Sequence, residues 1–265
     1  MLHSILNCLD SGYPWADRIR YYSSLDSTND LLKTMARQGA PHGTAVLAGH
    51  QSSGHGRLGR SFHSPEGMGI YLSILLRPNC PATALMHLTC AVAVAMCDAV
   101  EKATGFRPGI KWTNDLVYGK KKLGGILTEL GLSSTGSVDW AVIGIGINCC
   151  QQENDFPEEI RDIAASLNMV TGKSISPAAV SAAMLESLAH MDHRLLQEKD
   201  SCMEAYRQDC ITIGREISVV RGDDIRHGIA VSVDDEGALV VCYCDGTEET
   251  VNCGEVSIRG MYGYV

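Results

Sequence analysis

The segment 54–60, with the sequence Gly-His-Gly-Arg-Leu-Gly-Arg, places three glycines within six residues. Each glycine raises the conformational entropy that is lost on folding, so neither a helix nor a strand is a good structure for this segment. Between and after the glycines lie His55, Arg57 and Arg60, whose side chains would extend from a backbone that can approach a ligand closely. Taken alone, the pattern fits two structures equally well, a loop that wraps an anion such as a phosphate and a mobile surface loop.

The common phosphate-binding loops have a different spacing. A P-loop continues with Gly-Lys-Ser/Thr, whereas here Gly59 is followed by Arg60 and Ser61. A dinucleotide-binding fingerprint lies between a strand and a helix. Here the turn-rich residues 61–67 lead instead into the apolar run 69–76. The segment is therefore neither of these two motifs.

Apolar periodicity divides the chain into strands and helices that do not alternate regularly. Ser27 and Asp30 approximate a capping box at the start of a helix, and the turn residues 118–120 predict a hairpin. Because hairpins join some strands and long helices join others, we expect an α+β fold with a mixed β-sheet flanked by helices. Strands are expected at 18–22, 44–49, 69–76, 109–112, 123–130 and 138–147, and helices from 27, at 81–104, at 176–197 and at 201–210.

The chain after Gly214 has a different pattern. Short apolar runs alternate with turn sequences such as Asp-Asp-Glu-Gly at 234–237 and Asp-Gly at 245–246. Five short strands between residues 217 and 258 indicate a small β-barrel. We therefore expect two domains, formed by residues 1–213 and 214–265.

Composition and charge exclude several classes of protein. The chain has 265 residues and a formal net charge of −9, which argues against unspecific binding to nucleic acids or to an anionic membrane. Residues after Met1 do not form a basic region followed by an apolar stretch and a cleavage site, so no signal peptide is predicted. The apolar stretch around residues 90–96 is expected to be too short to span a bilayer.

The sequence contains 11 cysteines but no Cys-x-x-Cys pair. The closest pairs, Cys149-Cys150 and Cys242-x-Cys244, do not have the spacing of a zinc site. Most of the other cysteines lie in apolar stretches, where a reduced cysteine behaves as a small apolar residue. This usage predicts a reducing, cytoplasmic compartment.

Four further motifs accompany the Gly-rich segment. They are Asp-Ser-Thr-Asn at 26–29, Lys-Trp-Thr-Asn-Asp at 111–115, Lys-Leu-Gly-Gly-Ile-Leu at 122–127 and Gly-Ile-Gly-Ile-Asn at 144–148. In this order, and together with residues 51–60, they resemble the motifs of biotin–protein ligases (biotin–acetyl-CoA-carboxylase ligases). The C-terminal part resembles the small barrel of that family, so the resemblance covers nearly the whole chain.

The resemblance implies a fold and a reaction. The fold would be the catalytic domain that class II aminoacyl-tRNA synthetases and biotin ligases share, followed by an SH3-like C-terminal domain. The reaction would activate biotin with ATP and Mg²⁺ to biotinyl-5′-AMP. The biotinyl group would then pass to a lysine of a biotin carboxyl carrier protein domain, as in acetyl-CoA carboxylase or a related biotin-dependent carboxylase. A lipoate ligase or another acyl-carrier ligase of the same fold is the alternative.

The first step of this reaction joins two anions, so cationic groups must neutralise their repulsion. The resemblance implies Lys122, Arg57 and Asp115 as catalytic residues, with Asp115 also as the candidate Mg²⁺ ligand. Short polar side chains would bind the ureido ring, and glycines would form a flat wall beside the rest of biotin. The implied biotin-binding residues are Ser27, Thr28, Asn29, Gln51, Gly54, His55, Gly56, Arg57, Lys122, Gly125, Gly144 and Gly146. The implied ATP- and adenylate-binding residues are Arg57, Arg60, Phe62, Asn114, Lys122 and Asn148.

Three positions depart from the family pattern. His55 stands where the family usually has Arg or Lys, Thr113 replaces a Pro, and Phe62 stands where Trp is frequent. An imidazole keeps one hydrogen-bond donor, but its charge depends on pH. A phenyl ring can still stack on adenine.

Some members of the family carry an N-terminal helix-turn-helix and act as DNA-binding repressors. Only about 25 residues precede Ser27, too few for such a domain, so we expect a short form that does not bind DNA. An inactive binding module is a third class, and the presence of Lys122, Asp115 and Arg57 argues against it. The sequence leaves the oligomeric state open, a homodimer included.

Overall fold

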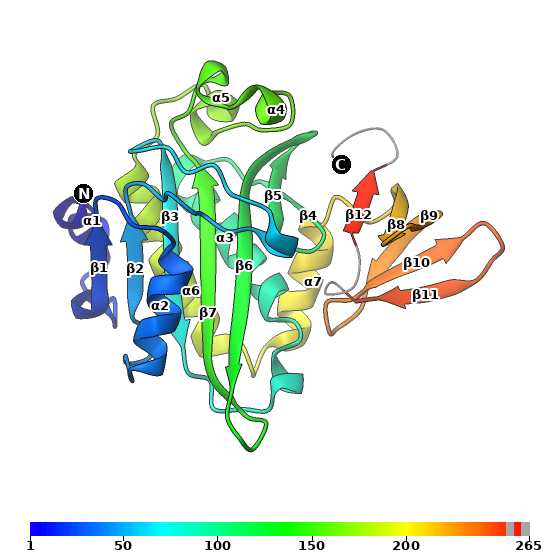
Figure 1. Ribbon diagram of the computed structural model, residues 1–265, viewed down its shortest axis with the longest axis horizontal. Helices are drawn as coiled ribbons and strands as arrows, with labels where there is room; N and C mark the ends of the chain where they lie inside the picture. The colour runs from blue at the N-terminus through cyan, green and yellow to red at the C-terminus, as the bar shows by residue number, and fades with distance from the viewer. Residues whose placement is uncertain (253–256, 261–265) are drawn as a thin grey trace.

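The computed structural model describes residues 1–252 and 257–260, and these form two β-sheets with helices packed against the first sheet (Figure 1). The first sheet has seven strands in the order β1-β2-β3-β7-β6-β5-β4. Strands β1 and β2 are parallel and the other neighbours are antiparallel. This mixed sheet confirms the expected α+β class. Its strands are β1 Ile19–Tyr22, β2 Ala45–Ala48, β3 Gly69–Leu76, β4 Gly109–Lys111, β5 Asp115–Tyr118, β6 Lys121–Leu132 and β7 Val138–Asn148.

The main hydrophobic core lies between one face of this sheet and two long helices, α3 (Leu88–Thr104) and α6 (Pro177–Arg194) (Figure 1). Helix α6 begins as its sequence predicts, because the hydroxyl of Ser176 accepts a hydrogen bond from the backbone N–H of Ala179 at 3.3 Å and Pro177 follows the cap. Burial of the apolar side chains of both helices is the main stabilising contribution on this face. Two shorter helices extend the layer, α1 (Leu2–Cys8) beside α6 and α7 (Lys199–Asp209) beside α3.

Helix α2 (Thr28–Arg37) covers the opposite face of the sheet (Figure 1). Its buried residues Leu32 and Ala36 form a second, smaller core with apolar residues of β2, β3 and β7, Trp140 among them. The hydroxyl of Ser27 caps the helix and accepts a hydrogen bond from the backbone N–H of Asp30 at 3.4 Å. This packing fixes the first turn of α2 over the middle of the sheet.

The second sheet is antiparallel, with the strand order β11-β10-β9-β8-β12, and forms the SH3-like C-terminal domain. It contacts the first part of the chain through the turn before β10. The indole N–H of Trp112 donates to the carbonyl oxygen of Gly237 at 2.9 Å, and the guanidinium of Arg207 donates to that of Val233 at 2.6 Å. The start of the strand expected at 255–258 lies outside the described residues. The strands are β8 Glu216–Arg221, β9 Asp224–Val233, β10 Leu239–Tyr243, β11 Glu248–Val251 and β12 Ser257–Gly260.

The predicted hairpin lies between β5 and β6, and the residue at its turn, Gly119, has a φ of +55° that favours glycine. Several short elements were not predicted. They are α1, strand β5, α4 (Glu158–Arg161), α5 (Leu167–Thr171) and the 3₁₀ turns η1 (Ala16–Arg18), η2 (Arg57–Gly59) and η4 (Glu153–Asp155). Elements of this length carry too little apolar periodicity to be recognised in a sequence. The helix expected at 81–104 is divided into the 3₁₀ turn η3 (Ala82–Leu85) and α3.

The expectation that the apolar stretch around residues 90–96 is too short to span a bilayer was wrong. The stretch Ala82–Thr104 is long and apolar enough, by length and composition, to cross a membrane. In this fold 67% of its 18-residue apolar window is buried inside the protein, because α3 is a core helix that packs on the sheet and on α6. The ten cysteines in the described part of the chain are free thiols.

Candidate active site

A cavity lies where the first turn of α2, the Gly-rich segment and strands β6 and β7 meet. Of the twelve residues implied for biotin, all except Gly54 line this cavity. The resemblance therefore assigned to one site residues that are more than 100 positions apart in the sequence. The lining residues are Ser27, Thr28, Asn29, Gln51, His55, Gly56, Arg57, Phe62, Asn114, Lys122, Gly125, Ile126, Leu127, Gly144, Ile145 and Gly146.

Gln51 is held at one end of the cavity by the start of α2. Its side-chain oxygen accepts hydrogen bonds from the backbone N–H and from the hydroxyl of Thr28, at 2.8 and 3.1 Å. Its amide nitrogen donates to the hydroxyl of Ser64 at 3.2 Å. Because the first N–H groups of a helix have no partner within the helix, Gln51 satisfies one of them and is itself fixed in place.

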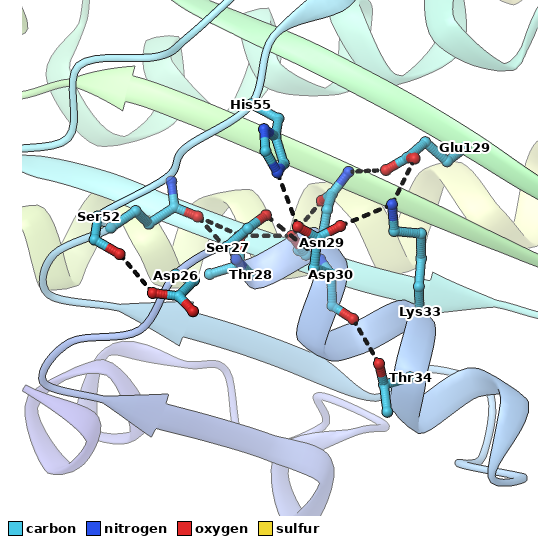
Figure 2. A network of polar contacts seen from close by, with 12 residues as sticks. Asp26, Ser27, Thr28, Asn29, Asp30, Lys33, Thr34, Ser52, His55 and Glu129 are labelled. Carbon is cyan, nitrogen blue, oxygen red and sulfur yellow. Dashed lines mark hydrogen bonds and ion pairs between the residues drawn. The ribbon is translucent and has the colours of Figure 1, made fainter. Parts of the chain in front are cut away.

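Asn29 is almost fully buried beside Thr28 and is held on both of its amide atoms (Figure 2). Its oxygen accepts a hydrogen bond from the hydroxyl of Ser73 on β3 at 2.5 Å, and its nitrogen donates to the carboxylate of Glu129 on β6 at 2.9 Å. A Cβ on Gly144 would lie only 2.1 Å from the Asn29 oxygen. The glycine in β7 therefore makes room for this side chain.

The Gly-rich segment is attached to the rest of the protein by polar groups. Its one large apolar side chain, Leu58, is 63% exposed, so it does not serve as an anchor. The imidazole Nε2 of His55 lies 2.8 Å from the carboxylate of Asp30 in the first turn of α2 (Figure 2). Burial raises the pKa of Asp30, but hydrogen bonds from Lys33 and from His55 outweigh this effect and hold the pKa below its usual range.

Arg57 and Asn114 connect the Gly-rich segment to the sheet. The guanidinium of Arg57 donates to the side-chain oxygen of Asn114 at 2.8 Å, and the Asn114 amide donates to the backbone carbonyl of Ile126 at 2.9 Å. Asn114 follows the Trp112–Thr113 peptide bond, which is cis. Two of the six residues implied for ATP and the adenylate, both of which line the cavity, therefore contact each other directly.

Lys122 and Asp115 form a close ion pair, with 2.6 Å between Nζ and the carboxylate. The Lys122 side chain is 29% exposed and lines the cavity, whereas the Asp115 side chain is 16% exposed and is not part of the lining. The backbone of Lys122 is fixed on both sides, since its N–H donates to Ile163 at 2.7 Å and its carbonyl accepts from Ala165 at 2.9 Å.

Gly125, Gly144 and Gly146 form a part of the cavity lining without side chains of its own, and Phe62 packs against Gly146. A Cβ on Gly146 would lie 2.6 Å from the ring of Phe62, and a Cβ on Gly125 would lie 3.1 Å from the Lys122 ammonium. Any larger residue at these positions would displace a side chain of the site. The ring of Phe62 also has an edge contact with Tyr71, with 6.4 Å between the ring centres.

Four of the implied residues lie outside the cavity lining, namely Gly54, Arg60, Asp115 and Asn148. A Cβ on Gly54 would lie 2.8 Å from the carbonyl oxygen of Phe62, so this glycine permits close packing within the loop. The amide of Asn148 donates to the backbone carbonyl of Ala165 at 3.1 Å and thus holds the segment next to Lys122. Within the described residues there is no group of three or more His, Cys, Asp or Glu side chains arranged to hold a metal ion.

Sequence reasoning missed several residues of the site. Ile126, Leu127 and Ile145 line the cavity. Ile126 and Ile145 are sequence neighbours of glycines that had been assigned to it, and Leu127 pairs with Gly144 across β6 and β7. Ser73, the support of Asn29, is a single polar residue within the apolar strand 69–76, which is a signal that could have marked it. No local pattern marks Glu129.

Sequence models of two domains match this chain. The model of the biotin/lipoate A/B protein ligase family matches residues 21–148, which contain the cavity. The chain belongs to the biotin/lipoate A/B protein ligase family. The model of the biotin protein ligase C-terminal domain matches residues 212–259, which contain most of the second sheet.

Individual relatives and solved structures of the family are similar over most of the chain. The bifunctional ligase/repressor BirA of Bacillus subtilis is 37% identical over 237 residues, which are 83% of this chain and 68% of that protein. The biotin–[acetyl-CoA-carboxylase] ligase of Paracoccus denitrificans is 31% identical over 224 residues, 82% of this chain and 90% of that protein. The biotin protein ligase of Aquifex aeolicus, solved in complex with biotin and ATP, is 29% identical with a TM-score of 0.78 and covers 92% of this chain and 99% of its own.

Proposed function

We propose that this protein is a biotin–protein ligase, in which the cavity binds biotin and ATP, forms biotinyl-5′-AMP and passes biotin to a lysine of a carrier domain. The observation that carries the proposal is the division of the cavity into two chemically different ends. The neutral groups Thr28 and Gln51 contact each other at the start of α2, whereas the cations Arg57 and Lys122 contact Asn114 and Asp115 at the start of β5. Biotin has the same two-part character, a neutral ureido ring and an anionic carboxylate.

The neutral end fits the ureido ring because it offers both donors and acceptors. The hydroxyls of Ser27 and Thr28 and the amide of Gln51 supply these groups, and the contacts of Gln51 with α2 fix their positions. We assign the ring system and the valeryl chain to the part of the cavity that Gly144 and Gly146 line, where the side chains of Asn29 and Phe62 pack against the two glycines. The carboxylate then extends toward Lys122.

In the first step a carboxylate oxygen of biotin attacks the α-phosphorus of ATP, and the bond to the pyrophosphate group breaks. Lys122 is well suited to stabilise the charge that develops on the α-phosphate oxygens, since its ammonium faces the cavity and its backbone is fixed. Arg57 supplies a second cation and is oriented by Asn114. We further assign Arg60 and Phe62 to the nucleotide.

ATP is a co-substrate that is used with Mg²⁺, an ion that usually keeps several waters and binds one or two carboxylates together with substrate phosphates. Asp115 is the carboxylate next to Lys122 and fits this requirement as a single ligand. In the second step the amine of the carrier lysine attacks the acyl carbon, and AMP leaves. We also assign the acceptance of that amine's proton to Asp115, as the carboxylate next to Lys122.

A direct test is to combine the protein with biotin, MgATP and a biotin carboxyl carrier domain, and to measure the mass of the carrier. The expected result is a gain of one biotinyl group on a single lysine. A parallel arm with lipoate in place of biotin tests the alternative acyl-carrier ligase. A mass gain with lipoate and none with biotin would overturn the proposal, as would no gain with either acid.

Three further assignments belong to this proposal. We place the catalytic domain in residues 1–213 and the SH3-like domain in residues 214–265, a division supported by the separation of the two sheets. The net charge of −9 supports a protein without affinity for DNA, which a gel shift at low salt tests. The free thiols of the described cysteines support a cytoplasmic location.

A further inference from the structure

A row of alternating charges connects the Gly-rich segment to strand β6 across the first turn of α2 (Figure 2). The carboxylate of Asp30 lies 2.8 Å from Nε2 of His55 on one side and 2.8 Å from the ammonium of Lys33 on the other. The same ammonium lies 2.7 Å from the carboxylate of Glu129. The second oxygen of Glu129 accepts the hydrogen bond from Asn29 described above, at 2.9 Å.

The two ends of this row are parts of the cavity, and its middle is not. His55 and Asn29 line the cavity, whereas Asp30, Lys33 and Glu129 do not. The three charged residues therefore act on a ligand through the two residues that they hold. Asp30 holds the Gly-rich segment against α2, and Lys33 and Glu129 hold α2 and Asn29 against the sheet.

The pKa shifts of Asp30 and Lys33 support a permanent ionic contact between these two residues. Burial lowers the pKa of Lys33, but its hydrogen bonds with Asp30 and Glu129 outweigh this effect and raise the pKa above its usual range. Lys33 therefore stays cationic and Asp30 stays anionic near neutral pH. A carboxylate beside a site for anionic substrates would repel them if it were unpaired. The ammonium of Lys33 compensates this charge, and the imidazole of His55 makes a hydrogen bond with the same carboxylate.

We propose that Asp30 is a positioning residue that holds the Gly-rich segment closed over the cavity through its contact with His55. The proposal rests on the proposed function and deepens it. A segment with three glycines loses much conformational entropy when a ligand orders it. The contact at Asp30 reduces this loss before the ligand arrives. Because the segment covers biotin in the ground state and in the transition state alike, removing the contact raises KM for biotin more than it lowers kcat.

The test is a double-mutant cycle of Asp30→Asn, His55→Gln and the double variant, assayed by biotin-dependent exchange of pyrophosphate into ATP. Both partners are 48% exposed, and ion pairs at such positions contribute little, so each single variant should raise KM for biotin about two- to fivefold. The double variant should be no worse than the poorer single variant, because the contact can be lost only once. Asp200→Asn, which removes a carboxylate from the first turn of α7, is the matched control and should keep the wild-type KM.

Hydrogen exchange of the free protein gives a readout that does not depend on activity. Backbone amides of residues 54–60 should exchange faster in Asp30→Asn and in His55→Gln than in the wild type or in Asp200→Asn. Unchanged exchange, or KM effects that multiply in the double variant, would overturn the positioning role. Failure of the wild type to form biotinyl-AMP would instead overturn the proposed function, and the exchange result would then stand by itself.

Discussion

Replacement of Gly144 by alanine should destabilise the protein, although a glycine within a strand is normally a weakness. Gly→Ala in a regular element usually stabilises by about 0.5–1 kcal/mol because the unfolded chain loses freedom. Here the added Cβ would lie 2.1 Å from the side-chain oxygen of Asn29 and 2.7 Å from its Cγ. Asn29 is only 4% exposed, so it cannot move into solvent without leaving its hydrogen bonds.

The loss of unfolding free energy in Gly144→Ala follows from the hydrogen bonds of Asn29. Displacing Asn29 breaks its contact with Ser73, worth about 1 kcal/mol, and its contact with the charged group of Glu129, worth about 2 kcal/mol. After the gain from the alanine backbone is subtracted, the variant should lose about 2 kcal/mol of unfolding free energy. For a chain of this size that corresponds to a fall in melting temperature of about 4–8 °C.

Thermal and urea unfolding of four variants, Gly144→Ala, Gly12→Ala, Asn29→Ala and the double variant at 144 and 29, test this reasoning. Gly12→Ala is the matched control, since no atom lies within 4 Å of its added Cβ, and it should change the unfolding free energy by less than about 0.5 kcal/mol. The double variant Gly144→Ala with Asn29→Ala should be no less stable than Asn29→Ala alone, because the methyl group then occupies the vacated space. The account is refuted if Gly144→Ala unfolds like Gly12→Ala, or if the losses at 144 and 29 add.

Three further outcomes are expected. Lys122→Ala should lower the rate of pyrophosphate exchange about 100-fold or more with little change in melting temperature. Lys121→Ala, at the first residue of β6, should keep the wild-type rate, and equal rates for the two variants would contradict the assignment. Burial lowers the pKa of His87 below 6.5, so the unfolded chain binds the extra proton and stability should fall as the pH drops below about 6.5. Urea unfolding at pH 7.5 and 5.5 should show a smaller drop for His87→Gln than for the wild type, and an identical drop would argue against this origin. Burial raises the pKa of the Cys90 thiol to about 12, so iodoacetamide at pH 8 should modify the exposed Cys8 and spare Cys90 in the folded protein, as peptide mass mapping would reveal.

The local sequence determined those parts of the protein that depend on neighbouring residues. The cap at Ser27 and the hairpin turn at Gly119 follow from side-chain hydrogen bonding and from a backbone conformation that glycine favours. The strands and long helices follow from the spacing of apolar residues, which is a local property. The family motifs added the grouping of residues 27–29, 122 and 144–146 into one site, which no local rule provides.

The tertiary structure alone decided which residues support the site, because their contacts depend on the register of the sheet. Ser73 pairs with Gly144 across β3 and β7, and Gly144 pairs with Leu127 on β6. This row opens a space that the Asn29 side chain fills, with the Ser73 hydroxyl on one side and Glu129 on the other. These partners lie 44 and 100 positions from Asn29 in the sequence. Contacts over such distances are selected by the packing of α2 on the sheet, and no periodicity within either segment encodes them.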